Sequence, residues 1–123
     1  DIIDDLIEKA KANGNACSAV SCYETVVLTE NRTSGKEQID RNRIVRVQTP
    51  QCYNYGLIKS LYEKADKDNR EDFVYANILA MNYGVEIYFS KGTNNNIKIT
   101  TKDDIALFRA LLYYINNAEG EEN

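Results

Sequence analysis

The chain has 123 residues and a net charge of −4, with 43% hydrophobic and 28% charged residues. This length fits one small domain, and this composition excludes the disordered, collagen-like and membrane-embedded classes of protein. The acidic balance argues against broad electrostatic capture of nucleic acid or of an anionic membrane. Because the sequence has no apolar run as long as a membrane span and no recognisable secretory signal, we expect a cytoplasmic protein without nucleic-acid or membrane partners.

Histidine is absent, and Cys17, Cys22 and Cys52 form no CxxC pair. The sequence therefore excludes histidine-based catalytic triads and indicates neither a disulfide framework nor a zinc site. We interpret the cysteines as small, mostly buried thiols, and we expect no metal ligands in this chain.

The first predicted element is an amphipathic helix closed by Gly14, a residue that suits a left-handed helix cap. Residues 15–22 and 23–30 have the composition of strands, and residues 31–36 that of a turn. Residues 37–49 resume extended structure, so the second and third strands are expected to form a two-stranded ribbon with a charged edge. Such a ribbon is marginally stable unless it packs on another surface.

The second half of the chain alternates helices with a strand. Residues 48–51, "QTPQ", are consistent with a turn that precedes a helix over 57–65. A further helix is expected over 73–83, ended by Gly84, and residues 85–90 form a short apolar strand. This alternation indicates an α/β fold with a mainly parallel sheet.

The last predicted helix begins at Thr101 and Asp104, whose spacing resembles a capping box. Its buried face is expected to consist of apolar residues at helical spacing: Ile105, Phe108, Leu111, Leu112 and Ile115. Residues 119–123, "EGEEN", form a solvated tail.

The charged edge of the ribbon is one candidate anion site. Arg41, Arg43 and Arg46, with Thr25 on the partner strand, could clamp a phosphate, because guanidinium groups and hydroxyls donate hydrogen bonds that match phosphate oxygens. Charges on an edge strand also protect against aggregation, and the residues alone favour this second interpretation.

Lys98, within "NNNIKITT", is the other candidate. On an extended segment its side chain faces opposite to Ile97 and Ile99, whose burial would fix the backbone beside the start of a helix. This geometry suits an anion site, although the residues alone favour a surface lysine on an edge strand.

The order and spacing of several motifs resemble those of a known family. These are "ACSAVSCYETV", "DRNRIVRVQTPQCY" followed by a helix, a helix ending in Gly84, "VEIYFSKG" and "NNNIKITTKDDIALFRALL". Together they resemble the C-terminal half of the 2-C-methyl-D-erythritol 4-phosphate cytidylyltransferase and ribitol-5-phosphate cytidylyltransferase family, over nearly the whole chain. Glu24-Thr25 stands where that family has an Asp-Thr pair.

The resemblance implies that residues 1–123 are the C-terminal part of a Rossmann-like nucleotidyltransferase domain, with residues 22–47 as a protruding β-arm that forms a homodimer. The implied activity transfers CMP from CTP to a polyol phosphate and releases pyrophosphate with the help of Mg²⁺. The same residues leave open a noncatalytic dimerisation or binding module derived from this family.

By motif, the resemblance assigns roles to four residues. Arg41 and Thr25 would bind the polyol phosphate in the neighbour's active site, and Thr49 of "QTPQ" would contact substrate as well. Lys98 would steady the α-phosphate of CTP during attack, which agrees with the dependence of phosphoryl transfer on well-placed cations.

Two departures qualify these roles. Val74-Tyr75 stands where the family usually has Thr-Asp, so that substrate contact is not carried over. The family's Gly-rich CTP-binding loop and its magnesium-binding Asp would precede Asp1, where the chain instead begins directly with a helix. We therefore expect that the N-terminal CTP-binding half is absent and that this chain is inactive when isolated.

Overall fold

The structure of the protein is a computed structural model that describes residues 1–71 and 75–118. The chain divides into two units, residues 1–92 and 93–123, and each is described by itself. The predicted helical position Phe73, the departure at Val74 and the predicted tail at 119–123 lie outside the described residues.

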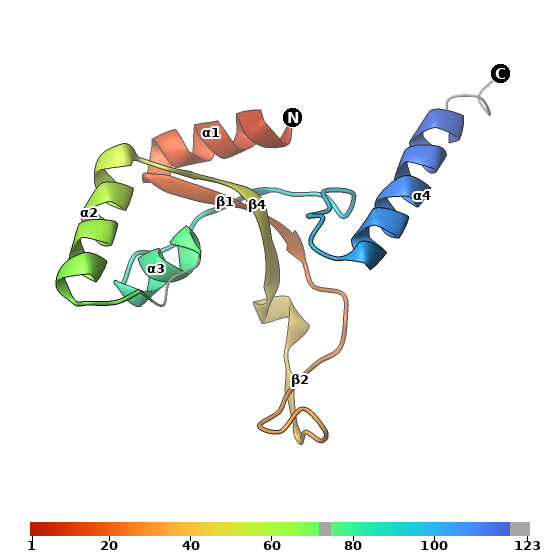
Figure 1. The fold of residues 1–123 in the computed structure, drawn as a ribbon, viewed down its shortest axis with the longest axis horizontal. Coiled ribbons are helices and arrows are strands. Elements are labelled where there is room, and N and C mark those ends of the chain that lie inside the picture. The colour runs from red at the N-terminus through yellow and green to blue at the C-terminus, as the bar shows by residue number, and fades with distance from the viewer. Residues whose placement is uncertain (72–74, 119–123) are drawn as a thin grey trace. The chain divides into compact units, whose positions relative to one another are not determined.

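The first unit is organised around a three-stranded sheet in the order β4-β1-β5 (Figure 1). Strand β1, Asn15–Ser21, lies in the centre; it pairs antiparallel with β4, Val45–Tyr53, and parallel with β5, Phe89–Lys91. The predicted α/β class is confirmed. The described sheet has one parallel and one antiparallel pairing, because β4 returns from the arm in the direction opposite to β1.

Helices cover both faces of this sheet. Helix α1, Ile2–Asn13, packs Leu6 and Ala10 against Ala16 of β1. The next residue, Cys17, points to the other face, as alternation along a strand requires. There it joins a core built with helices α2, Tyr55–Lys67, and α3, Ala76–Asn82. The core residues on this second face are Cys17, Leu61, Ala65, Leu79, Ala80 and Ile87.

The glycines predicted to end helices do so. Gly14 has φ +87° and donates its N–H to the Ala10 carbonyl at 2.8 Å, and Gly84 has φ +77° and follows Tyr83, the cap residue of α3. Both residues adopt the left-handed backbone conformation that favours glycine. The three cysteines are unpaired thiols, with Cys17 and Cys22 buried, as predicted.

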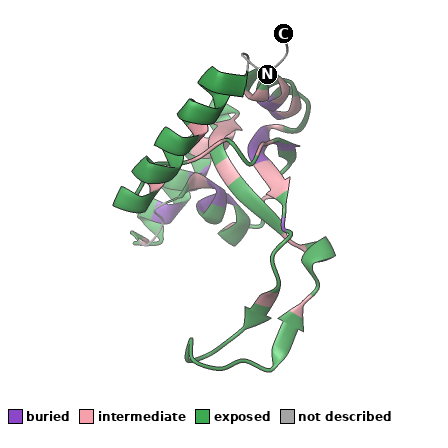
Figure 2. Ribbon diagram, turned by 90° about the vertical axis from the view of Figure 1, so that its right-hand side faces the viewer, coloured by how far each residue is buried: buried purple, intermediate pink, exposed green. Residues whose placement is uncertain are grey.

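The predicted ribbon is present. Strands β2, Val26–Leu28, and β3, Glu37–Ile39, pair antiparallel, with Val26 opposite Ile39 and Leu28 opposite Glu37. Figure 2 shows that most of this ribbon is exposed. Throughout, "the arm" means residues 22–47, which contain this ribbon.

The expectation of continuous extended structure over 37–49 is wrong. A 3₁₀ turn, η1, Arg41–Arg43, separates β3 from β4. The Asp40 side chain accepts a hydrogen bond from the Asn42 N–H at 3.0 Å. A short acidic side chain that bonds to the backbone two residues ahead offers a local alternative to strand pairing.

The expectation of a turn at residues 48–51 is also wrong, because β4 continues through this segment to Tyr53. The register between β1 and β4 shifts between Cys17 and Ala19, whose partners are Gln51 and Val47. Pro50 lies in the extra stretch on β4. A bulge tolerates proline because its missing N–H interrupts no ladder there.

The described part of the second unit contains helix α4, Lys102–Ala118. The expectation that this helix buries an apolar face is not met: none of its residues is buried in the described chain, and Ile105, Leu112 and Ile115 are between 41% and 46% exposed. Helical spacing of apolar residues predicts an apolar stripe, but it does not supply a surface that covers the stripe. Among the described residues, no helix has the length and apolarity needed to cross a membrane.

Candidate functional site

The base of the arm brings together two segments that carry predicted site residues. Arg41, in η1, donates a hydrogen bond from Nη1 to the carbonyl oxygen of Tyr23 at 2.9 Å. Thr25 follows two residues after Tyr23, and both Arg41 and Thr25 are exposed. The structure therefore places a guanidinium beside the segment that carries the predicted threonine.

A pocket of about 440 Å³ lies at this position. It is lined by Ser21, Cys22, Tyr23, Arg41, Asn42, Ile44 and Val45. A pocket with an arginine, an amide and a hydroxyl on its walls can hold an anionic polar group through charge-assisted hydrogen bonds. The sequence did not indicate Tyr23 or Asn42 as lining residues: Tyr23 lies 18 residues before Arg41 and meets it only through the fold, and Asn42 follows Arg41 directly in η1.

Glu24 bonds to the first residues of the arm. Its carboxylate accepts hydrogen bonds from the Tyr23 N–H at 3.2 Å and from the Cys22 thiol at 3.4 Å, and it lies 3.9 Å from Nη1 of Arg46. Hydrogen bonding from its own backbone, the Cys22 thiol and the positive charge of Arg46 lower the pKa of Glu24. Glu24 thus stays ionised and pairs with Arg46, while Arg41 lines the pocket.

The structure therefore does not bring the three arginines of the predicted clamp together at the pocket. Arg41 lines the pocket, Arg46 pairs with Glu24, and Arg43 is not among the lining residues. Thr49 is exposed on β4, at the bulge in the sheet, and does not line the pocket either.

Lys98 belongs to the second unit and is exposed. The segment around it is not a strand: it follows a turn in which the Asn96 N–H bonds to the Thr93 carbonyl oxygen at 3.1 Å. The expectation that Ile97 and Ile99 are both buried is wrong, because Ile97 is half-buried and Ile99 is 49% exposed. Burial of isoleucines therefore does not fix this segment.

Asp104 bonds to the segment instead. Its Oδ2 accepts hydrogen bonds from the N–H groups of Thr100 and Thr101, at 3.0 and 2.7 Å, and from both of their hydroxyls, at 3.0 and 2.9 Å. The Asp104 N–H bonds to the Thr101 hydroxyl oxygen at 3.3 Å, so the predicted capping box is confirmed. The backbone hydrogen bonds from Thr100 and Thr101, followed by those from their hydroxyls, lower the pKa of Asp104 to about 2.

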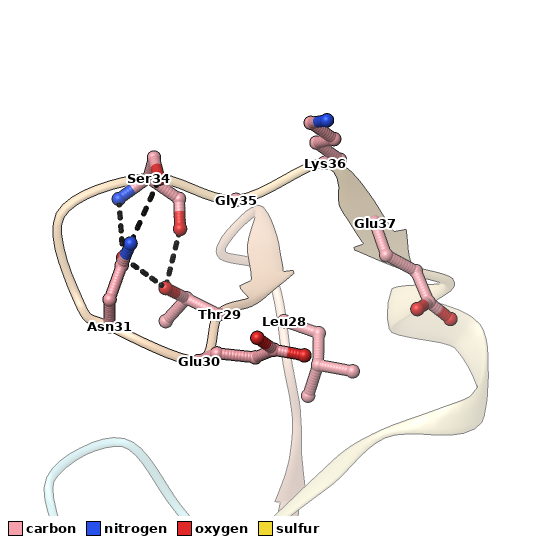
Figure 3. A pocket seen from close by; sticks show the side chains of 8 residues that line it. All are labelled: Leu28, Thr29, Glu30, Asn31, Ser34, Gly35, Lys36 and Glu37. Carbon is pink, nitrogen blue, oxygen red and sulfur yellow. Dashed lines mark hydrogen bonds between the residues drawn. The ribbon is translucent and has the colours of Figure 1, made fainter.

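A second pocket, of about 340 Å³, lies at the tip of the arm (Figure 3). Its loop is closed by its own side chains, because Asn31 Oδ1 accepts the N–H groups of Thr33 and Ser34 at 2.9 and 3.0 Å. Gly35 is required here, since a Cβ would lie 2.7 Å from the Leu28 carbonyl oxygen. None of the four predicted site residues lines this pocket.

A divalent metal would need a cluster of ligands. Within residues 1–71 and 75–118, no group of three or more His, Cys, Asp and Glu side chains is arranged to hold a metal ion.

Comparison with known proteins links the chain to one group of enzymes. The sequence model of the 2-C-methyl-D-erythritol 4-phosphate cytidylyltransferase family matches residues 1–114. A ribitol-5-phosphate cytidylyltransferase from Lacticaseibacillus paracasei is 36% identical over 113 residues, which cover 90% of this chain and 48% of that relative. A 2-C-methyl-D-erythritol 4-phosphate cytidylyltransferase from Clostridium novyi is 35% identical, with the same shares covered.

Solved structures show the same relationship. The 2-C-methyl-D-erythritol 4-phosphate cytidylyltransferase of Francisella tularensis is 26% identical with a TM-score of 0.76, over 89% of this chain and 51% of that one. The enzyme of that name from Thermus thermophilus, at 23% identity and a TM-score of 0.77 over 91% of this chain and 54% of that one, shows the fold alone. The chain thus spans about half the length of the curated relatives it matches.

Proposed function

Because the chain belongs to the 2-C-methyl-D-erythritol 4-phosphate cytidylyltransferase family, we propose that the full-length protein transfers CMP from CTP to the phosphate of a small polyol and releases pyrophosphate. The family match over residues 1–114 is the observation that carries this proposal. Relatives of nearly equal identity are named for ribitol 5-phosphate and for 2-C-methyl-D-erythritol 4-phosphate, so the proposal names the class of polyol phosphates. We also propose a cytoplasmic location for the full-length protein, which fits an enzyme that uses CTP.

Arg41 and Thr25 are proposed to bind the polyol phosphate, with Thr49 as a further substrate contact. The pocket at the base of the arm supports the role of Arg41, because a planar guanidinium can present two parallel N–H groups to a phosphate. The substrate would gain orientation from these contacts, which brings its phosphate oxygen into line with the phosphorus that it attacks.

The arm is proposed to form a homodimer and to deliver Arg41 and Thr25 to the neighbour's active site. The ribbon is two-stranded and exposes Val27 and Leu28 at 47% and 55%. A ribbon of this kind gains stability by packing against another surface, and a second copy of the chain is the proposed surface.

Lys98 is proposed to act on the reacting phosphate. An oxygen of the polyol phosphate forms a bond to the α-phosphorus of CTP, and the bond from that phosphorus to the bridging oxygen of the β-phosphate breaks, so that pyrophosphate leaves. Negative charge shifts onto the oxygens around the α-phosphorus during this step. A fixed ammonium stabilises that charge more in the transition state than in the ground state.

Magnesium is expected for this chemistry from the resemblance, and its ligands are proposed to lie in the part of the full-length protein that corresponds to the uncovered half of the relatives. The described residues of this chain would contribute the acceptor-binding and α-phosphate contacts.

The test uses purified full-length protein, CTP, a magnesium salt and a panel that includes ribitol 5-phosphate and 2-C-methyl-D-erythritol 4-phosphate. We expect pyrophosphate release that depends on one of these acceptors. Residues 1–123 alone should release none, because they span about half the length of their relatives. If folded full-length protein released no pyrophosphate with any acceptor yet still dimerised, the noncatalytic module would be the correct account.

A further inference from the structure

A single carboxylate oxygen holds the segment that follows Lys98. Oδ2 of Asp104 accepts four hydrogen bonds, two from backbone N–H groups and two from hydroxyls of Thr100 and Thr101, all within 2.7 to 3.0 Å. Capping a helix requires far less than this, since one or two such bonds complete a capping box. The additional bonds from Thr100 tie a residue that lies outside α4.

Lys98 lies between two points at which the backbone is held. Before it, the Asn96 N–H bonds to the Thr93 carbonyl oxygen at 3.1 Å and the Ile97 N–H bonds to that of Asn95 at 3.0 Å. After it, Thr100 is bonded to Asp104. Two residues, 98 and 99, separate the held positions. These hydrogen bonds hold the backbone on both sides of Lys98, in a stretch that is neither a strand nor buried.

We propose that Asp104 is a positioning residue for Lys98: by holding Thr100 and Thr101 against the first turn of α4, it fixes the backbone from which the Lys98 ammonium reaches the α-phosphate of CTP. This inference rests on the proposed function of Lys98. Asp104 itself touches no substrate. A displacement of about 1 Å in a catalytic group can lower the rate by roughly 10²-fold, so a carboxylate distant from the reaction can control the rate through a neighbouring lysine.

The matched control for Asp104 is Asp103. Both carboxylates lie in the first turn of α4, with Asp103 exposed and Asp104 half-buried, so either substitution removes one negative charge near the positive end of the helix dipole. Asp104→Ala should lower kcat by about 10- to 100-fold and leave the KM values for CTP and polyol phosphate within about threefold. Asp103→Ala should keep kcat within about twofold of the wild type.

Two further variants separate positioning from helix capping. Asp104→Asn keeps a carbonyl oxygen that accepts fewer and weaker hydrogen bonds, so its kcat should lie between those of the wild type and Asp104→Ala. The double variant Lys98→Ala/Asp104→Ala should be no slower than Lys98→Ala alone, because Asp104 acts through the lysine. If the two losses instead multiplied, Asp104 would act independently of Lys98, and the proposal would be wrong.

A readout that needs no activity keeps this inference distinct from the proposed function. Hydrogen exchange of the full-length protein should show faster exchange at the Thr100 and Thr101 amides in Asp104→Ala than in Asp103→Ala, because their acceptor is lost. Unchanged exchange would overturn the inference. An inactive wild-type protein would instead refute the proposed function. The exchange comparison would still show whether Asp104 holds the Thr100 and Thr101 amides.

Discussion

Tyr23 precedes and Arg41 follows the ribbon of β2 and β3 in the sequence, and a hydrogen bond of 2.9 Å from Arg41 Nη1 to the Tyr23 carbonyl oxygen joins them. The bond orients the guanidinium toward the wall of the pocket that both residues line. A guanidinium carries five N–H donors, so a single bond to a carbonyl leaves capacity for a phosphate. Arg41 can therefore close the base of the arm and bind a substrate with the same group.

The first prediction concerns this double role. Arg41→Ala in the full-length protein should raise the KM for the polyol phosphate by roughly 10- to 100-fold, the effect of losing hydrogen bonds to a charged group. The KM for CTP should stay within about threefold of the wild type, because Arg41 is proposed to contact the acceptor alone. Steady-state kinetics with each substrate varied in turn measure both values. Arg43→Ala is the control, since Arg43 lies in the same turn outside the pocket lining.

The second prediction tests whether Arg41 serves the neighbouring subunit. Arg41→Ala and Lys98→Ala proteins are mixed under conditions that exchange subunits, and activity is measured at a polyol phosphate concentration well below the raised KM of Arg41→Ala, where each variant alone has low activity. In a heterodimer with shared sites, one site receives both lesions and the other receives none, so random mixing should restore about a quarter of the wild-type activity. If exchange occurred without any recovery, the two residues would serve a site within one chain.

The third prediction concerns pH. The folded-state pKa of Asp104 is about 2, below the ordinary value of 3.8, because backbone N–H groups and hydroxyls bond to the ionised form. A lowered pKa in the folded state means that this carboxylate stabilises the fold above about pH 4, and that the contribution is lost as the pH falls toward 2. Titration of the Asp104 carboxyl carbon by NMR should give a midpoint near 2. A midpoint at or above the ordinary value would show that the four hydrogen bonds do not form in solution.

The fourth prediction concerns the contact of Gly92 with strands β1 and β4. The Gly92 N–H bonds to the Ala19 carbonyl oxygen at 3.0 Å, and a Cβ on Gly92 would lie 2.7 Å from that oxygen and 2.5 Å from Gln48 Oε1. Gly92→Ala should therefore lower the free energy of unfolding by about 1–3 kcal/mol, as forced overpacking does. Gly56→Ala, whose new Cβ would meet Asn54 Oδ1 at 3.3 Å in a helix, should change it by less than about 1 kcal/mol. Urea unfolding of both variants provides the comparison, and equal effects would contradict it.

Local chemistry explains which parts of the fold could be predicted. Gly14, Gly84 and the pair Thr101 and Asp104 act within one or two turns of backbone, so the sequence around them contains the information that determines each helix end. The ribbon of β2 and β3 was predictable for a similar reason, since a short polar turn joins two β-branched segments.

Contacts between distant residues explain what could not be predicted. The inclusion of Pro50 in β4 depends on β1, which lies about thirty residues earlier and shifts its register beside the proline. The position of Arg41 depends on Asp40, which turns the backbone away from strand pairing, and on the Tyr23 carbonyl. Ile99 and most apolar residues of α4 are exposed. Regular spacing of apolar residues in the sequence therefore indicates which side chains can be buried together, but their burial also requires a surface that covers them.

The candidate site, like the fold, could be predicted only in part. Arg41, Thr25, Thr49 and Lys98 were indicated by motif, and of these the structure places Arg41 in the lining of a pocket. Asp104 was predicted as a helix cap. Its hold on Thr100 became evident only in the structure, because a hydrogen bond from a residue before the cap follows no standard spacing.

The central claim is that this chain supplies the cation that assists transfer at the α-phosphate. Its most direct test is kcat of the full-length Lys98→Ala protein at saturating CTP and polyol phosphate, beside Lys102→Ala, which removes an exposed lysine from the start of α4. Loss of one preplaced electrostatic group predicts a fall in kcat of roughly 10²–10³-fold for Lys98→Ala, with partial recovery in Lys98→Arg. Lys102→Ala should stay within about twofold of the wild type. A kcat for Lys98→Ala within about threefold of the wild type would show that the lysine takes no part in the transfer.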